Sequence, residues 1–112
     1  MDTQSSSHKI DIRTLTVSDR LDALRASELR QALASTIDDG VVRIVVDLSA
    51  TTFVDSAGLA SLAKGMKDCR AGGGDLRVVG SRHPDASRVF SLTRFDQVFM
   101  MGDSAQELIE SW

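Results

Sequence analysis

The sequence predicts a single α/β domain with a mostly parallel sheet of four to five strands and about four helices. Strand-like and helix-like segments alternate along the 112 residues, and residues 41–48 are β-branched and almost continuously apolar. Alternation of this kind is typical of parallel sheets, whose central strands are covered on both faces. The crossovers should be right-handed, and functional sites in such sheets lie beyond the carboxyl ends of the strands.

The first part of the chain predicts a strand and a helix. Residues 1–8 are expected to form a disordered lead, so the domain is expected to span residues 9–112. Alternating apolar side chains predict a strand over residues 10–17 with an irregularity near Thr14, or else two short strands there. Helical apolar spacing follows and ends at residues 38–40. The expected buried stripe of this helix consists of Leu24, Ala26, Leu29, Ala32, Leu33 and Ile37.

After the apolar strand over residues 41–48, the pattern continues to alternate. Residues 49–52 are expected to form a loop, with Phe53 and Val54 filling the space beneath it. A helix should begin at Ser56 and end at the glycines of residues 71–74, before a short strand over residues 76–80. The third helix opens at Pro84. Its expected buried side is Val89, Phe90 and Leu92, residues 97–101 are strand-like, and Ser104 with Glu107 has capping-box spacing for a last helix.

The composition argues against several classes of function. Thirteen basic and sixteen acidic residues give a net charge of −3, which argues against nucleic acid as the main partner. No apolar run is long enough for membrane insertion, and no secretory signal is recognised. The single cysteine, Cys69, rules out an internal disulfide, and with two separated histidines it offers no metal-ligand spacing. We therefore expect a cytoplasmic protein without a metal or cofactor.

The most informative segment is Asp55-Ser56-Ala57-Gly58-Leu59, at the expected junction between a strand and a helix. The N–H groups and the dipole of a helix start favour an anion there. Spacing alone leaves two interpretations of Ser56 about equal: a helix cap or a site of phosphorylation. Asp22 also follows a strand and should lie at the same edge of the sheet. It is expected to cap the first helix, or else to serve as an acidic contact beside Ser56.

A catalytic role has little support in the sequence. Ser56 is not part of a Gly-x-Ser-x-Gly elbow, and a nucleophilic serine needs a positioned base. The two histidines are poor candidates for that base, because His8 lies in the expected lead and His83 precedes Pro84 in a loop. We therefore expect a binding protein and not an enzyme.

Several segments resemble STAS domains, and specifically the bacterial anti-sigma factor antagonists. The resemblance is carried by Val-Val-Asp-Leu-Ser at residues 45–49 and Thr-Phe-Val-Asp-Ser-Ala-Gly-Leu at residues 52–59. It continues through residues 71–80 and includes Leu21-Asp22, so that it covers about residues 10–110. It implies a STAS-like fold and a binding switch. In that family the unphosphorylated protein binds an anti-sigma factor that is also a serine kinase, and a serine phosphatase resets the switch, which regulates transcription by partner switching.

The resemblance also assigns roles to residues. Ser56 is the expected phosphoacceptor, and Asp22 and Asp55 are expected to flank the partner-binding surface. That surface is completed by Ser56, Ala57, Gly58 and Leu59, with Gly58 allowing the partner to approach closely. The chain departs from the family at Asp19, where glycine is usual. The alternative function is that of an unphosphorylated STAS subunit in a transporter complex or signalling assembly.

Overall fold

The computed structural model describes residues 2–6 and 11–112, and within them strands and helices alternate. The strands are β1 (Asp2–Ser6), β2 (Ile12–Thr16), β3 (Asp19–Leu21), β4 (Arg43–Asp47), β5 (Thr51–Val54), β6 (Asp75–Val79) and β7 (Met101–Gly102). The helices are α1 (Ala23–Asp38), α2 (Ser56–Ala71), α3 (Pro84–Leu92) and α4 (Ala105–Glu110), with one 3₁₀ turn, η1 (Phe95–Gln97).

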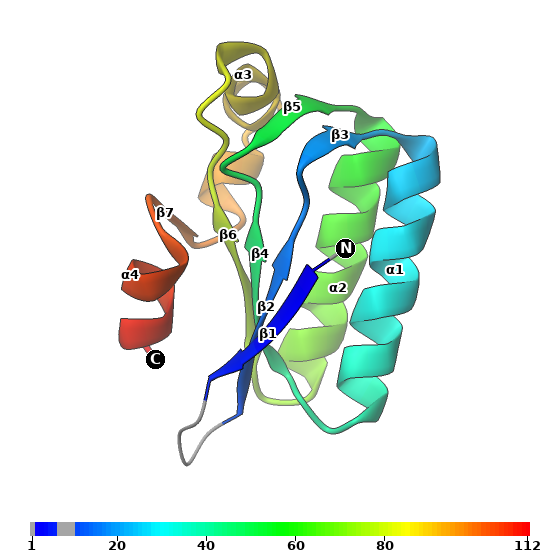
Figure 1. Cartoon of the computed structure of the whole chain (residues 1–112), viewed down its shortest axis with the longest axis vertical. Coiled ribbons are helices and arrows are strands. Elements are labelled where there is room, and N and C mark those ends of the chain that lie inside the picture. Colours follow the sequence, from blue (N-terminus) through cyan, green and yellow to red (C-terminus); the bar gives the residue numbers. More distant parts are fainter. Residues whose placement is uncertain (1, 7–10) are drawn as a thin grey trace.

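The main sheet has the strand order β1-β2-β4-β6-β7. Its pairs β2–β4, β4–β6 and β6–β7 are parallel, and only β1 runs antiparallel to its neighbour β2. The predicted α/β fold with a mostly parallel sheet is confirmed. A second, parallel sheet of two strands is formed by β3 and β5. Figure 1 shows this small sheet beyond the carboxyl ends of β2 and β4, where it leads into α1 and α2.

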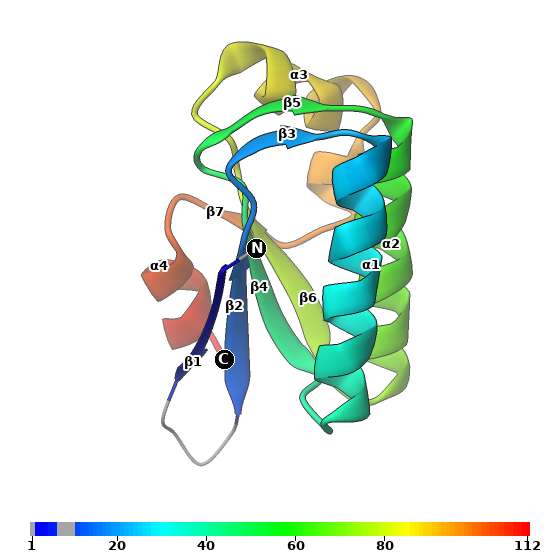
Figure 2. The same ribbon diagram turned by 45° about the vertical axis from the view of Figure 1, so that its right-hand side comes forward.

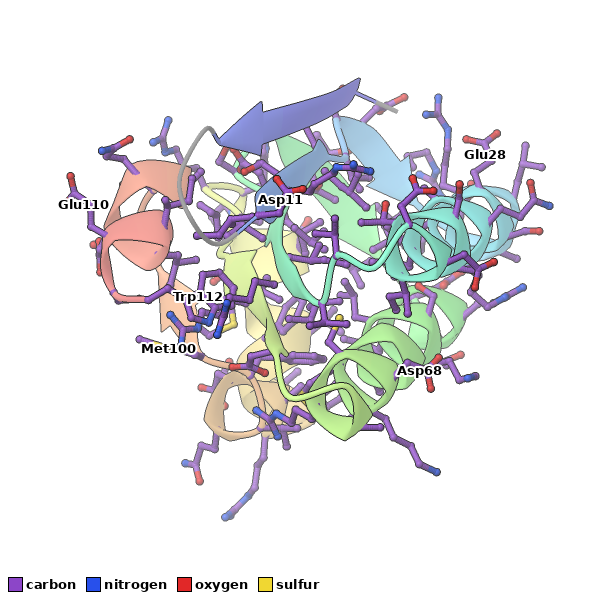
Figure 3. The ribbon with its side chains drawn as sticks, turned by 90° about the horizontal axis from the view of Figure 1, so that it is seen from below. Asp11, Glu28, Asp68, Met100, Glu110 and Trp112 are labelled. Atoms are coloured by element: carbon purple, nitrogen blue, oxygen red, sulfur yellow. The ribbon has the colours of Figure 1, made fainter. Side chains whose placement is uncertain are left out.

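Helices α1 and α2 lie on one face of the main sheet, α4 lies on the other, and α3 lies at the end of the molecule beside β5 (Figure 2). The view from below shows α1 and α2 on one side of the sheet and α4 with Trp112 on the other (Figure 3). Gly65 allows the helices α1 and α2 to pack closely, because an added Cβ would lie 2.7 Å from Leu33 Cδ1 and 2.9 Å from Leu76 Cδ1. The core beneath these helices includes Leu15, Leu29, Ile44, Val46, Leu62 and Val78. The smaller core beneath α4 consists of Ile12, Val45, Val79 and Leu108.

Part of the expected N-terminal lead is a strand. Residues 2–6 form β1, whereas residue 1 and residues 7–10 lie outside the described part of the chain. The register runs from Asp2 opposite Thr16 to Ser6 opposite Ile12. The sequence of β1 has no alternating apolar residues, and a strand that pairs only through its backbone cannot be predicted from such a pattern. The sheet therefore begins before residue 9, which was the expected start of the domain.

The prediction of a loop over residues 49–52 is wrong for residues 51 and 52, which belong to a strand. Thr51 begins β5, and the hydroxyl of this buried residue donates a hydrogen bond to the Val17 carbonyl. Phe53 does not fill the space beneath, since its side chain lies on the outer face of β5 and is 36% exposed. The expected irregularity near Thr14 is also absent, because β2 runs without interruption and is covered on both faces.

Two leucines expected to be buried are exposed. Leu24 is 70% exposed because it lies in the first turn of α1 and points away from the sheet, and Leu92 is 75% exposed at the end of α3. The strand predicted over residues 97–101 is wrong except at its end, because Gln97 is the last residue of η1 and β7 begins at Met101. Between them Phe99 turns inward to make edge-to-face contacts with Phe90 and Phe95, with ring centroids 6.4 and 5.8 Å away.

Candidate functional site

Two helices begin side by side at the carboxyl end of the sheet. Leu21 pairs with Val54 in the small parallel sheet, so the next residues, Asp22 and Asp55, are neighbours. The Asp55 N–H donates a hydrogen bond of 3.3 Å to the Leu21 carbonyl. This bond holds the start of α2 against the end of β3 (Figure 1). The structure thus brings Asp22 and the segment around Ser56 to one edge, as their positions after strands predicted.

Both aspartates are helix N-caps. The Asp22 carboxylate accepts a hydrogen bond of 3.2 Å from the Arg25 N–H, and the Asp55 carboxylate accepts one of 3.0 Å from the Gly58 N–H. Each bond satisfies an N–H that has no partner within its helix. The interpretation of Asp22 as a cap is confirmed. The same interpretation of Ser56 is wrong, because Asp55 occupies the cap position and Ser56 is the first residue of α2.

The hydroxyl of Ser56 is exposed and available. Among residues 11–112, no side chain or backbone group is found in a hydrogen bond with it, and its side chain faces solvent. It stands in the first turn of a 16-residue helix, where the helix dipole favours a negative charge. The neighbouring Asp55 carboxylate is a fixed negative charge at the same place. An anion added to Ser56 would therefore meet both an attraction and a repulsion.

Gly58 and Leu59 face the interior. A Cβ on Gly58 would lie 2.7 Å from the Leu21 carbonyl oxygen and 2.8 Å from Leu21 Cγ, so glycine is required for α2 to pack on β3. Leu59 is 6% exposed and belongs to the main core. Of the residues expected to form the partner-binding surface, Ser56 is exposed, and Asp22, Asp55 and Ala57 are half-buried.

Arg20, which the sequence did not single out, and Phe53, which was expected to be buried, lie beside these residues. The Arg20 guanidinium carbon lies 4.1 Å from the centroid of the Phe53 ring, and Arg20 Nε lies 3.6 Å from Asp22 Oδ2. The hydrogen bond from the Arg25 N–H, together with the charge of Arg20, holds the pKa of the Asp22 carboxyl below its usual value. One signal was present in the sequence: Arg20 and Phe53 each stand two residues before a capping aspartate.

Asp19 has the backbone conformation that normally requires glycine. Its φ angle is +75°, and the pairing of β3 with β5 shifts register between Asp19 and Arg20. The Asp19 carbonyl accepts a hydrogen bond of 3.3 Å from the Thr52 hydroxyl. Asp19 thus has the left-handed backbone conformation that glycine adopts most easily. The shift leaves Thr52 of β5 without a Cα partner in β3, so that Arg20 pairs with Phe53.

Within residues 2–6 and 11–112, no group of three or more His, Cys, Asp or Glu side chains is arranged to hold a metal ion. None of the helices in the same residues has the length and apolar character needed to cross a membrane.

Comparison with known proteins decides the family. A family model described as "STAS domain" matches residues 5–108. The chain belongs to the STAS domain family. The assignment inferred from the residues around Asp55 and Ser56 is therefore confirmed.

The relatives that this chain resembles include anti-sigma factor antagonists. Over 86 residues this STAS protein is 29% identical to BtrV of Bordetella bronchiseptica, a candidate anti-sigma factor antagonist, and the match covers 77% of this chain and 73% of BtrV. An anti-sigma factor antagonist from Mycobacterium paratuberculosis has a TM-score of 0.81 and 28% identity, covering 98% of this chain and 92% of that one. The antagonist SpoIIAA shares the fold at 18% identity with a TM-score of 0.79 in its unphosphorylated form, covering 98% of this chain and 95% of that one. Its phosphorylated form, from Bacillus, has a TM-score of 0.71 at 19% identity and covers 98% of both chains.

Proposed function

We propose that this STAS protein is an anti-sigma factor antagonist controlled by phosphorylation of Ser56. The unmodified protein binds an anti-sigma factor that has serine kinase activity, and the sigma factor is then free to act on transcription in the cytoplasm. Phosphorylation of Ser56 by this partner dissociates the complex, and a serine phosphatase removes the phosphate so that the protein can bind again. The observation that carries the proposal is the exposed, unbonded Ser56 hydroxyl in the first turn of α2, next to Asp55.

The local geometry suits a modification that is added and removed repeatedly. Asp55, and not Ser56, makes the hydrogen bond that caps α2, so a phosphate on Ser56 leaves that bond intact. The modified serine would remain in the first helical turn, where a negative charge is favourable. The phosphoprotein therefore keeps its fold, and the change is one of surface charge.

The effect of the phosphate on binding follows from that charge. A phosphate adds about −1.5 to −2 charges near pH 7. Asp22 and Asp55 already place negative charge at this edge. A phosphate buried in such an interface loses its hydration and is repelled by Asp55. A loss of roughly a hundredfold in affinity is expected for a charge placed in this way.

The test is phosphorylation by the kinase partner from the native cell. The purified protein is incubated with ATP and this kinase, and the modified residue is located by mass spectrometry. Phosphate is expected on Ser56 in the parent and in Ser87→Ala, an exposed serine on α3 chosen as control. If Ser56→Ala accepts as much phosphate as the parent, the proposal fails. Retention of the partner by the unmodified form, and its loss from the phosphorylated form, completes the test.

A further inference from the structure

We propose that Arg20 is the internal counter-ion of phosphorylated Ser56. In the unmodified protein its guanidinium stacks on Phe53 and lies next to Asp22. In the phosphorylated protein it leaves both and binds the phosphate. This inference rests on the proposed function, since it assumes that Ser56 carries a phosphate.

The backbone places Arg20 on the same outer face of the small sheet as Asp55, the residue that precedes Ser56. Leu21 and Val54 are buried, so the residues on either side of them in β3 and β5 project outward. Both capping aspartates have an extended backbone, with φ and ψ of −95° and −172° at Asp22 and −111° and −176° at Asp55. The outward alternation therefore continues to the caps. Ser56 follows directly and is exposed.

The present contacts of Arg20 are weak enough to be exchanged. Its side chain is 53% exposed, that of Asp22 is 35% exposed, and solvent screens an ion pair between such groups. The 3.6 Å distance from Arg20 Nε to the Asp22 carboxylate exceeds the length of a normal charge-assisted hydrogen bond. Stacking on Phe53, which is 36% exposed, holds the guanidinium at the surface without burying it. Arg20 is thus positioned close by and remains free to turn.

A phosphate offers Arg20 a better partner than Asp22 does. It carries up to two negative charges and three acceptor oxygens, which match the planar donors of a guanidinium in a bidentate pair. Asp22 accepts the Arg25 N–H with its Oδ1 atom, so part of its acceptor capacity is already used for the cap. The nearby Arg25 lies 3.9 Å from Glu28 through its Nε atom, along the side of α1. Arg20 is therefore the basic residue that the small sheet offers to the phosphate.

This exchange alters the surface at a second place. When Arg20 turns to the phosphate, the Phe53 ring is uncovered and Asp22 loses a neighbouring positive charge. A partner that recognises the unmodified surface then meets an altered arrangement around β3 as well as the phosphate on α2. The two states of the protein consequently differ in side-chain positions although the backbone stays the same.

The test uses the full chain with phosphoserine incorporated at position 56 during synthesis. The second pKa of the phosphate is measured by ³¹P NMR titration in this protein and in its Arg20→Gln variant. Because a nearby positive charge stabilises the dianion, Arg20→Gln is expected to raise this pKa by about half a unit. The matched control, Arg30→Gln, removes the same charge from α1 about two turns beyond its start and should leave the pKa nearly unchanged. An equal effect of the two substitutions would overturn the proposal.

A second measurement follows the arginine itself. Phosphorylation should move the Arg20 Nε–Hε signal and the Phe53 ring signals in NMR spectra, with the ring signals approaching those of Arg20→Gln. Phe53 signals that are the same in the unmodified and phosphorylated proteins would contradict the exchange. Because the phosphoserine is built in, these results do not depend on any kinase. Failure of the kinase to modify Ser56 therefore rejects the proposed function, whereas an unchanged phosphate pKa rejects only the role of Arg20.

Discussion

A Cβ on Gly58 would lie 2.7 Å from the carbonyl oxygen of Leu21. That carbonyl also accepts the Asp55 N–H, so the backbone at the end of β3 and the start of α2 cannot easily separate. The glycine of the Asp-Ser-Ala-Gly-Leu segment is therefore explained by packing within the chain. A surface role for Gly58 is not needed to account for it.

Gly58→Ala should destabilise the protein, because its methyl group would collide with backbone and with the buried Leu21 side chain. Overpacking of this kind costs about 1–3 kcal/mol in the free energy of unfolding. The matched control is Gly80→Ala, where the new Cβ would lie 3.7 Å from Met101 Cε, an ordinary contact. Urea denaturation of both variants measures the difference. Equal stability of the two variants would contradict the close packing of α2 on β3.

Stability should also depend on the ionisation of Asp22. Its pKa is lower in the folded protein than in the unfolded chain, chiefly because of the hydrogen bond from the Arg25 N–H. The carboxylate therefore contributes stability that is fully present above its unfolded pKa, near 4. This contribution is lost as the pH falls through the lower, folded pKa. Asp22→Asn keeps a capping oxygen and cannot titrate, so its urea midpoint should fall less than that of the parent between pH 5 and pH 3, about one unit either side of that value. Parallel curves would show that Asp22 has no such role.

Asp19→Gly should make the protein more stable, because Asp19 has a φ angle of +75° that favours glycine. The left-handed conformation costs an ordinary residue about 1 kcal/mol, which sets the upper limit of the expected gain. Asp19→Ala serves as the control and should be less stable than Asp19→Gly, since alanine tolerates this conformation poorly. Thermal unfolding of the three proteins gives the order. Alanine and glycine variants of equal stability would exclude strain at this position.

Arg77 should fix the end of α4 to the sheet. Its guanidinium carbon lies 3.8 Å from the Trp112 ring centroid, and its Nη1 atom donates a 2.6 Å hydrogen bond to the Ser111 hydroxyl. Arg77→Met keeps most of the aliphatic stem but removes the charge and the donor. Because Trp112 is the single tryptophan of the chain, its fluorescence should change in this variant and become more accessible to iodide quenching. Arg43→Met, on the neighbouring strand β4, is the control.

The sequence predicted the parts of the fold that depend on apolar patterns. The run over residues 41–48 contains β4, and the apolar spacing after Ser56 matches α2. The prediction from sequence failed for strands that are held mainly by backbone hydrogen bonds. β1, β3 and β5 have few apolar residues or are short, and the pairing of β3 with β5 joins segments that are distant along the chain. Such pairing leaves no local pattern.

The candidate site was also predicted only in part. The positions of Asp22 and Asp55 followed from strand ends, which a parallel sheet gathers at one edge. The identity of the α2 cap did not follow, because aspartate and serine are equally good caps and stand next to each other at Asp55 and Ser56. Arg20 was missed because its neighbour Phe53 was expected to be buried, and only the small sheet brings the two together.

The parallel pairing of β3 with β5 means that α1 and α2 begin at the same level and point the same way (Figure 1). Each helix start carries about half a positive charge, so this end of the molecule holds about one positive charge that belongs to no side chain. The two aspartate caps offset it. In a protein with a net charge of −3, this edge is thus less negative than its residues suggest, and it has room for a further anion.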